Sequence, residues 1–243
     1  MTPGLSLSQP EQLAQQIHPP LSDRVLIAIE VALRTAWVEM LEDPAVQNIL
    51  QNGKEKQITN VLRERLERIR VRENGSLEYN CNVFERPHVD AEYSNYKNEK
   101  AERPDLVFHL SGRPRPGVVD SLYDGLYVEC KIIDNKRRDL GEYCRKGVKR
   151  FVDGDYGWRM PQGMMCAYIR TNQELPVALE GYFGAAGVAA FLYLANTSLT
   201  KSALTMHNPF IYISDHARPW TFPDGSSPGN ISVQHLWLRA YSE

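Results

Sequence analysis

The sequence lacks the features that mark several common classes of protein. Its 243 residues contain no run of eighteen apolar residues, which argues against a transmembrane helix. The N-terminus has neither the basic start nor the apolar block of a secretory signal. The four cysteines are scattered and form no C-x-x-C pair, which argues against a disulfide framework and against a zinc site. These absences predict a cytoplasmic protein that does not associate with a membrane.

The motifs of nucleotide hydrolysis and ester hydrolysis are missing as well. The chain has no glycine-rich phosphate-binding loop, so ATP hydrolysis is not expected, and no G-x-S-x-G sequence, which argues against an α/β-hydrolase. No two of the six histidines have metal-ligand spacing. His109 shares strand parity with Asp105 and could face the same groove, although a structural role is the favoured interpretation. The net charge of −2 means that any attraction to phosphate has to be local.

The hydrophobic pattern predicts an α/β protein. Apolar residues recur at helical spacing from residue 22 to Pro44, and again from Gly53 onward. Apolar strands are predicted at 105–110, 126–133 and 164–169, a basic helix at 135–151, a helix rich in alanine and glycine at 177–194, and closing strands at 209–213 and 232–238. This order predicts a central mixed β-sheet flanked by helices.

The same pattern predicts one domain behind a short leader. Residues 1–21 are rich in proline, which prevents a stable helix, so we expect a flexible leader there. Residues 22–243 then form a single domain. It divides into an N-terminal helical extension at 22–50, a core at 53–170, and a C-terminal helix with closing strands at 171–243.

An acid and a lysine stand two positions apart inside the strand at 126–133. Because strand residues alternate between faces, Glu129 and Lys131 point to one side while Cys130 points to the other. Upstream, Asp105 follows Pro104 and opens another short apolar strand. Two carboxylates and one lysine are the groups that a divalent metal and an attacking water require in phosphodiester hydrolysis.

The spacing alone is weak evidence. Asp134 and Lys136 fit it too, but Asp134 falls where the apolar run stops. An exposed ion pair on an edge strand is the ordinary explanation of such a pattern. Only Glu129 and Lys131 lie inside an apolar strand downstream of the strand that Asp105 opens, and this context favours a functional site.

Together with the preceding helix, these strands resemble the PD-(D/E)xK nuclease superfamily, which has the restriction-endonuclease-like fold. In that family the first acid begins one strand of a hairpin, the E-x-K sequence lies on the next strand, and an earlier helix often supplies a further glutamate. The resemblance covers residues 53–170, and the connection between its two strands is long, which suggests an insertion near the substrate groove. The matching residues are Pro104-Asp105, Glu129-Cys130-Lys131 and, on the helix, Glu55, with Glu64 as a less favoured substitute.

The resemblance implies a catalytic set of Asp105, Glu129, Lys131 and Glu55. Asp105 and Glu129 would ligate Mg²⁺, for which Mn²⁺ can substitute, with the backbone carbonyl of Cys130 as a further candidate ligand. Lys131 would orient the attacking water or stabilise the developing charge. Glu55 would hold metal-bound water or ligate a second metal, and the sequence leaves one metal and two metals open.

Basic residues near these strands are candidates for binding nucleic acid. Arg138, Arg145 and Lys149 have a spacing that could place them on one helix face, and Arg113 and Arg115 lie in the insertion. We expect these five to contact phosphates without sequence preference. A solvated helix face explains the same pattern equally well.

The sequence therefore predicts a Mg²⁺-dependent endonuclease that acts on DNA, with RNA as a less favoured substrate and restriction or antiviral defence as the setting. The balanced charge and the lack of a DNA-reading module suggest a partner protein that supplies targeting, and a homodimer would suit double-strand cutting. One alternative is a nuclease-fold protein that binds nucleic acid or assembles a complex without cleavage. Another is an unrelated interaction protein in which the motif is accidental.

Overall fold

The structure is a computed structural model that describes residues 16–72, 83–89, 91–97, 101–112, 115–134, 139–204 and 211–240. Its helices are α2 (Asp23–Glu42), α3 (Gln47–Asn52), α4 (Glu55–Arg72), α5 (Asp139–Tyr143), α6 (Lys149–Asp153), α7 (Leu175–Phe183) and α8 (Val188–Phe191), with a 3₁₀ turn η2 (Ser121–Tyr123) and a π turn η3 (Cys144–Val148). Its strands are β1 (Tyr93–Ser94), β2 (Ala101–Glu102), β3 (Leu106–His109), β4 (Gly125–Ile133), β5 (Gln162–Ile169), β6 (Thr200–Lys201), β7 (Tyr212–Ala217) and β8 (Asn230–Arg239).

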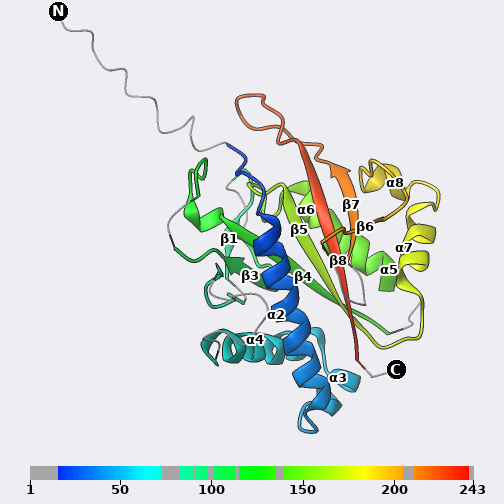
Figure 1. Cartoon of the computed structure of the whole chain (residues 1–243). Helices are drawn as coiled ribbons and strands as arrows, with labels where there is room; N and C mark the ends of the chain where they lie inside the picture. The colour runs from blue at the N-terminus through cyan, green and yellow to red at the C-terminus, as the bar shows by residue number, and fades with distance from the viewer. Residues whose placement is uncertain are drawn as a thin grey trace, which may run out of the picture.

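A six-stranded mixed sheet forms the centre of the fold, in the order β3-β4-β5-β8-β7-β6. β3 pairs antiparallel with β4, whereas β4, β5 and β8 run parallel, and β7 and β6 continue antiparallel. The predicted α/β class with a mixed sheet between helices is confirmed. The expectation that the last strands close the sheet is wrong for β8, which runs through its interior (Figure 1), because β5 and β7 pair with its two edges.

The helices cover both faces of this sheet. Cross-strand neighbours share a face, so Glu129, Met165 and His235 lie on one side, while Cys130, Cys166 and Leu236 lie on the other. On the Cys130 side, α2 and α4 cover the sheet. Trp37 stacks on Tyr168 with ring centroids 5.4 Å apart, and the Thr59 and Tyr168 hydroxyls are 3.0 Å apart. On the Glu129 side, η3 and its flanking helices α5 and α6 pack against the strands.

The segment before α2 is part of this domain. Leu21 is buried, its backbone N–H donates to Gln162 Oε1 at 2.7 Å, and the N–H of His18 donates to the carbonyl of Arg159 at 2.7 Å. Residues 16–21 therefore belong to the packed domain, so the leader predicted for residues 1–21 extends too far; residues 1–15 lie outside the described residues. α2 likewise is an integral layer of the fold. Within the described ranges, no helix combines the length and the apolar character needed to cross a membrane.

Two predicted helices are not regular along their whole length. The predicted basic helix consists of α5, the π turn η3 and α6 in succession. A Cβ at Gly147, within η3, would overlap Met165 and lie 3.6 Å from the Cγ of Glu129. Glycine therefore lets this turn pack directly on the strand of Glu129. The helix predicted at 177–194 divides into α7 and α8, with Gly187 at a φ of 78° between them.

A chain of buried polar side chains links the sheet to the helices behind it. The Nδ1 of His216 lies 2.8 Å from the carbonyl of Leu192, so it carries the proton and Nε2 accepts from Ser214 at 2.7 Å. Ser214 Oγ in turn accepts from His235 Nε2 at 2.8 Å, which leaves His235 Nδ1 to accept from Tyr143 at 2.7 Å. This assignment satisfies every link with both imidazoles neutral, the form that burial favours.

Candidate active site

The site lies where one edge of β4 loses its strand partner. β3 begins at Leu106, opposite Val128, and the described residues give β4 no strand on this edge beyond that point. The backbone groups of Cys130 are therefore free to contact side chains. Its N–H donates to Asp105 Oδ2 at 2.7 Å, and its carbonyl accepts from Lys131 Nζ at 2.7 Å. Asp105 thus caps the exposed edge just before its own strand begins.

Three carboxylates from three parts of the chain converge on the Lys131 ammonium. Nζ lies 2.8 Å from Glu129 Oε1, 3.0 Å from Glu55 Oε1 and 4.0 Å from Asp105 Oδ2. Glu55 begins α4 and reaches the cluster around the open edge of β4, from the opposite face of the sheet. The structure therefore brings together all four residues predicted as catalytic, and the Cys130 carbonyl with them.

Burial differs sharply within the cluster. The Glu129 side chain is only 4% exposed, whereas Asp105 is 26% and Glu55 34% exposed. Burial and the nearby charge of Glu129 raise the pKa of Asp105 to about 7, against the opposing effects of Lys131 and the Cys130 N–H. Burial disfavours the Lys131 ammonium, but Glu129, Glu55 and Asp105 outweigh it, so its pKa is raised. The cluster carries more negative charge than one ammonium neutralises.

Tyr156 holds the buried end of Glu129. Its hydroxyl donates to Glu129 Oε2, and the ring is completely buried, with Gly154 and Gly157 at positive φ on either side. These glycines turn the chain so that the tyrosine points back under β4. Burial, followed by the charge of Glu129, raises the pKa of Tyr156 well above its usual range, so the phenol stays protonated and remains a donor.

Arg150 is a second residue that the sequence interpretation missed. Its Nη1 lies 3.9 Å from Glu129 Oε1 and 3.9 Å from Oε2 of Glu102, a buried carboxylate on β2. Arg150 lies one position after Lys149, which was predicted instead. The π turn that precedes α6 changes which basic side chain faces β4. Only a helix of regular pitch can be read from the sequence, so the residue that enters the site was not identifiable.

The other predicted basic residues lie elsewhere. Arg145 and Lys149 share a face as expected, but that face meets the Phe191 ring, at 5.9 and 5.3 Å from its centroid. Arg115 forms a salt bridge with Asp124 at 2.6 Å and donates to the carbonyls of residues 19 and 20. It lies in the connection at the far end of the β3–β4 hairpin from the cluster, where it has a structural role. Arg113 and Arg138 lie outside the described residues.

His109 is also structural. Its side chain is buried, and its Nε2 lies 2.7 Å from the Tyr93 hydroxyl. Glu64, the alternative to Glu55, is exposed nine residues further along α4, whereas Glu55 contacts Lys131.

The donor atoms suit Mg²⁺, although they do not form a ready metal site. Among the residues that the structure describes, no three His, Cys, Asp or Glu side chains are grouped to hold a metal ion. The carboxylates converge on Lys131 instead. Carboxylate and carbonyl oxygens are the ligands that Mg²⁺ prefers, and the excess of negative charge favours a cation. The donor types and the charge therefore fit Mg²⁺, while the ammonium competes for the same oxygens.

Comparisons of the chain with protein-family models, with curated proteins and with solved structures find no match.

Proposed function

We propose that this protein is a Mg²⁺-dependent nuclease of the PD-(D/E)xK superfamily that hydrolyses phosphodiester bonds of DNA. One observation carries the proposal. Asp105, Glu129 and Glu55 gather around Lys131 at an open strand edge that reaches solvent. The first acid precedes one strand of an antiparallel hairpin and the E-x-K sequence lies on the other strand, which is the arrangement that the resemblance implies.

Each residue has a part in this proposal. Asp105, Glu129 and the Cys130 carbonyl would hold the ion, and Glu55 would hold its outer water. Mg²⁺, when bound, supplies a Lewis acid and a water of lowered pKa. The raised pKa of Lys131 favours a role as a donor that stabilises developing negative charge over a role as a general base.

Tyr156 would act as a positioning residue in the same reaction. The Tyr156 hydroxyl and the burial of Glu129 together hold this carboxylate in one orientation. A ligand that is fixed in advance loses little freedom when it binds an ion.

The alternative that a specific observation favours is binding of nucleic acid without cleavage. The ammonium of Lys131 already satisfies the oxygens of Glu129 and Cys130 that an ion would need. A protein that has no use for a metal can keep this cluster as a buried ion-pair network. Divalent-cation dependence therefore separates the two functions.

The test is cleavage of plasmid, linear duplex, single-stranded DNA and RNA in Mg²⁺, Mn²⁺ or EDTA. Glu129→Gln and Lys131→Met each remove one charge at nearly constant shape. The chain contains its own control, because Asp134→Asn and Lys136→Met make the same changes in the second acid-x-lysine sequence. We expect Mg²⁺-dependent cleavage that falls by about 10²-fold or more in the first pair and persists in the control pair. Cleavage that survives both substitutions would contradict the site, and tight binding with no cleavage would support the alternative.

A further inference from the structure

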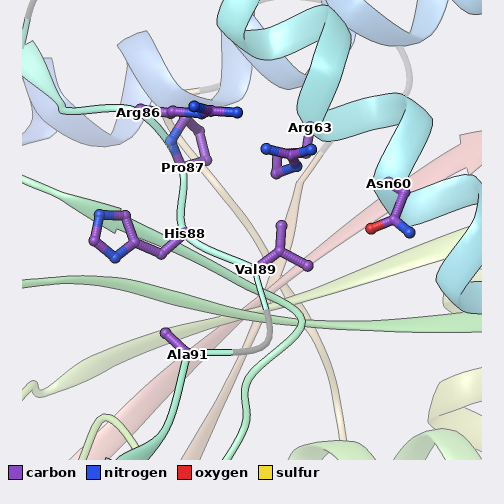
Figure 2. Close-up of a pocket in the computed structure, with 7 residues that line it drawn as sticks. All are labelled: Asn60, Arg63, Arg86, Pro87, His88, Val89 and Ala91. Atoms are coloured by element: carbon purple, nitrogen blue, oxygen red, sulfur yellow. The ribbon is translucent and has the colours of Figure 1, made fainter.

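A second polar site lies beside the cluster, in a pocket between α4 and the segment that precedes β1. The pocket has a volume of about 370 Å³. Asn60 and Arg63 line it from α4, and Arg86, His88 and Val89 line it from the facing segment. Figure 2 shows the Arg86 side chain extending toward Arg63 across the pocket. Two guanidinium groups and an amide thus border one space.

Among the described residues, the positive charges of this pocket are balanced only in part. The Nε of Arg63 is buried and has no hydrogen-bond partner among the described residues. A buried N–H without a partner is costly, more so when it belongs to a cation. Glu67 lies near enough for Arg63 and Arg86 to lower its pKa, yet the main cause is Arg70, which binds both Glu67 oxygens at 2.9 and 3.0 Å. The Glu67 carboxylate is therefore paired with Arg70, and a bound anion would supply the acceptor that Arg63 lacks.

The position of the pocket relates it to the candidate active site. Asn60 and Arg63 lie five and eight residues after Glu55 on one helix, which places them ~8 and ~12 Å further along its axis. His88 exchanges two backbone hydrogen bonds of 3.0 Å with Val107, two residues from Asp105, or ~7 Å along the strand. Neighbouring phosphates of one strand are separated by the rise along the axis and by the winding of the backbone, so these distances place the pocket within a few nucleotides of the site.

We propose that the pocket of Asn60, Arg63 and Arg86 binds a phosphate group and, resting on the proposed nuclease function, that this is a backbone phosphate within a few nucleotides of the bond that is cut. Guanidinium groups bind phosphate through paired N–H donors, which suits two arginines in one pocket. The contact sets the register of the strand and reads no bases.

The first experiment measures binding to labelled duplex DNA, single-stranded DNA and RNA in EDTA, where the proposed enzyme cannot cut. The pocket variant is Arg63→Met/Arg86→Met. Its matched control is Arg24→Met/Arg68→Met, which removes the same charge from two exposed arginines outside the pocket. We expect the pocket variant to lose about tenfold or more in affinity. The slope of the logarithm of its binding constant against the logarithm of the salt concentration should become shallower by ~0.9 for each lost duplex phosphate contact. Equal losses of affinity in the two double variants would refute the proposed phosphate site.

Thermal unfolding is measured first, to check that both double variants are folded. If the pocket variant is unfolded, Arg86→Gln alone is measured, because Arg86 is exposed and its loss removes no core contact. Arg63→Lys adds a check on geometry, since it keeps the charge but loses the paired donors. Unchanged affinity in Arg86→Gln would also overturn the proposal.

The second experiment replaces one phosphate at a time in the DNA strand with a neutral methylphosphonate. The wild-type protein should lose affinity at a single position beyond the cut site, and the pocket variant should show no loss there. A loss that persists at the same position in the pocket variant would assign the contact to another residue and overturn the proposal.

These results separate the pocket from the proposed function. If Glu129→Gln abolishes cleavage while the pocket variant binds nucleic acid like the wild type, the proposed nuclease function is supported and the proposed phosphate site is refuted. If the wild type binds no nucleic acid, the nuclease proposal is rejected, and the Tm is then measured with and without pyrophosphate at matched ionic strength. A rise in Tm for the wild type that the pocket variant does not show would support the phosphate site. No rise in Tm for either protein would reject the phosphate site as well.

Discussion

The buried chain of His216, Ser214 and His235 makes part of the stability of this protein dependent on pH. Burial lowers the pKa of His235 to about 3, with a contribution from His216, and burial lowers the pKa of His216 to about 4. Both histidines have an ordinary pKa near 6.5 in the unfolded chain. Between the folded and unfolded pKa values the unfolded state binds more protons than the folded state. The contribution of the two neutral histidines to the free energy of unfolding is therefore fully present above pH 6.5 and is lost as the pH falls toward 4.

The size of this loss follows from the two shifts. At pH 5 each unfolded imidazole is about 1.5 pH units below its pKa, which corresponds to ~2 kcal/mol per histidine, or ~4 kcal/mol for both relative to pH 8. Asp105 acts in the opposite direction. Its folded pKa of about 7 lies above its unfolded value, so the folded state gains protons, and with them stability, as the pH falls through 7. The total pH profile therefore mixes two signs, and a difference between variants isolates the histidines.

The test compares the wild type with His235→Gln in urea at pH 8, 7, 6 and 5, followed by tryptophan fluorescence. The variant should be less stable at pH 8 by ~1–3 kcal/mol, because the substitution leaves buried groups without partners. The gap between the two proteins should shrink by ~2 kcal/mol at pH 5. His88→Gln removes a histidine whose side chain is exposed and serves as the control. A gap that stays constant or widens on acidification would refute the neutral chain.

Four further substitutions test other features of the structure. Tyr156→Phe removes the donor to Glu129 Oε2 and should lower the free energy of unfolding by ~1.5–3 kcal/mol in urea titrations. Lys131→Met should lower it by ~3–5 kcal/mol in EDTA, because buried Glu129 loses the nearer of its two cations. Mg²⁺ should then raise the Tm of this variant more than that of the wild type, and equal shifts would contradict the ligand assignment. Gly163→Ala places a Cβ 2.6 Å from a buried phenylalanine ring and should lower the free energy of unfolding by ~1–3 kcal/mol in the same titration. Gly181→Ala, in open space on α7, should instead raise the free energy of unfolding by ~0.5–1 kcal/mol.

The central cluster was predictable because it depends on local periodicity. Alternation within β4 places Glu129 and Lys131 on one face, and a short antiparallel neighbour places Asp105 opposite them. The helical pattern after Gly53 locates Glu55 at the first turn of α4. Each of these inferences uses one element and one contact between elements, so the sequence pattern was sufficient.

The remaining contacts depend on features that have no period in the sequence. Tyr156 enters the site through a turn between two glycines, and Arg150 replaces its neighbours because of a π turn. Arg63 and Arg86 line the same pocket from two segments that are far apart in the sequence. The described residues around Pro19 and Pro20 form no helix, as expected, but these prolines did not prevent Leu21 from packing on the core.

The interior position of β8 sets the order in which the protein can be completed during synthesis. β3, β4 and β5 leave the ribosome well before Asn230–Arg239, yet β5 must wait for β8 to cover its second edge. Until then α2 also lacks the Arg239 carbonyl, to which Trp37 donates at 2.6 Å. Pairing across such a long separation is slow and leaves strand edges exposed in the meantime. A growing chain can therefore carry the carboxylates and lysine of its candidate active site for some time before the sheet beneath them is finished.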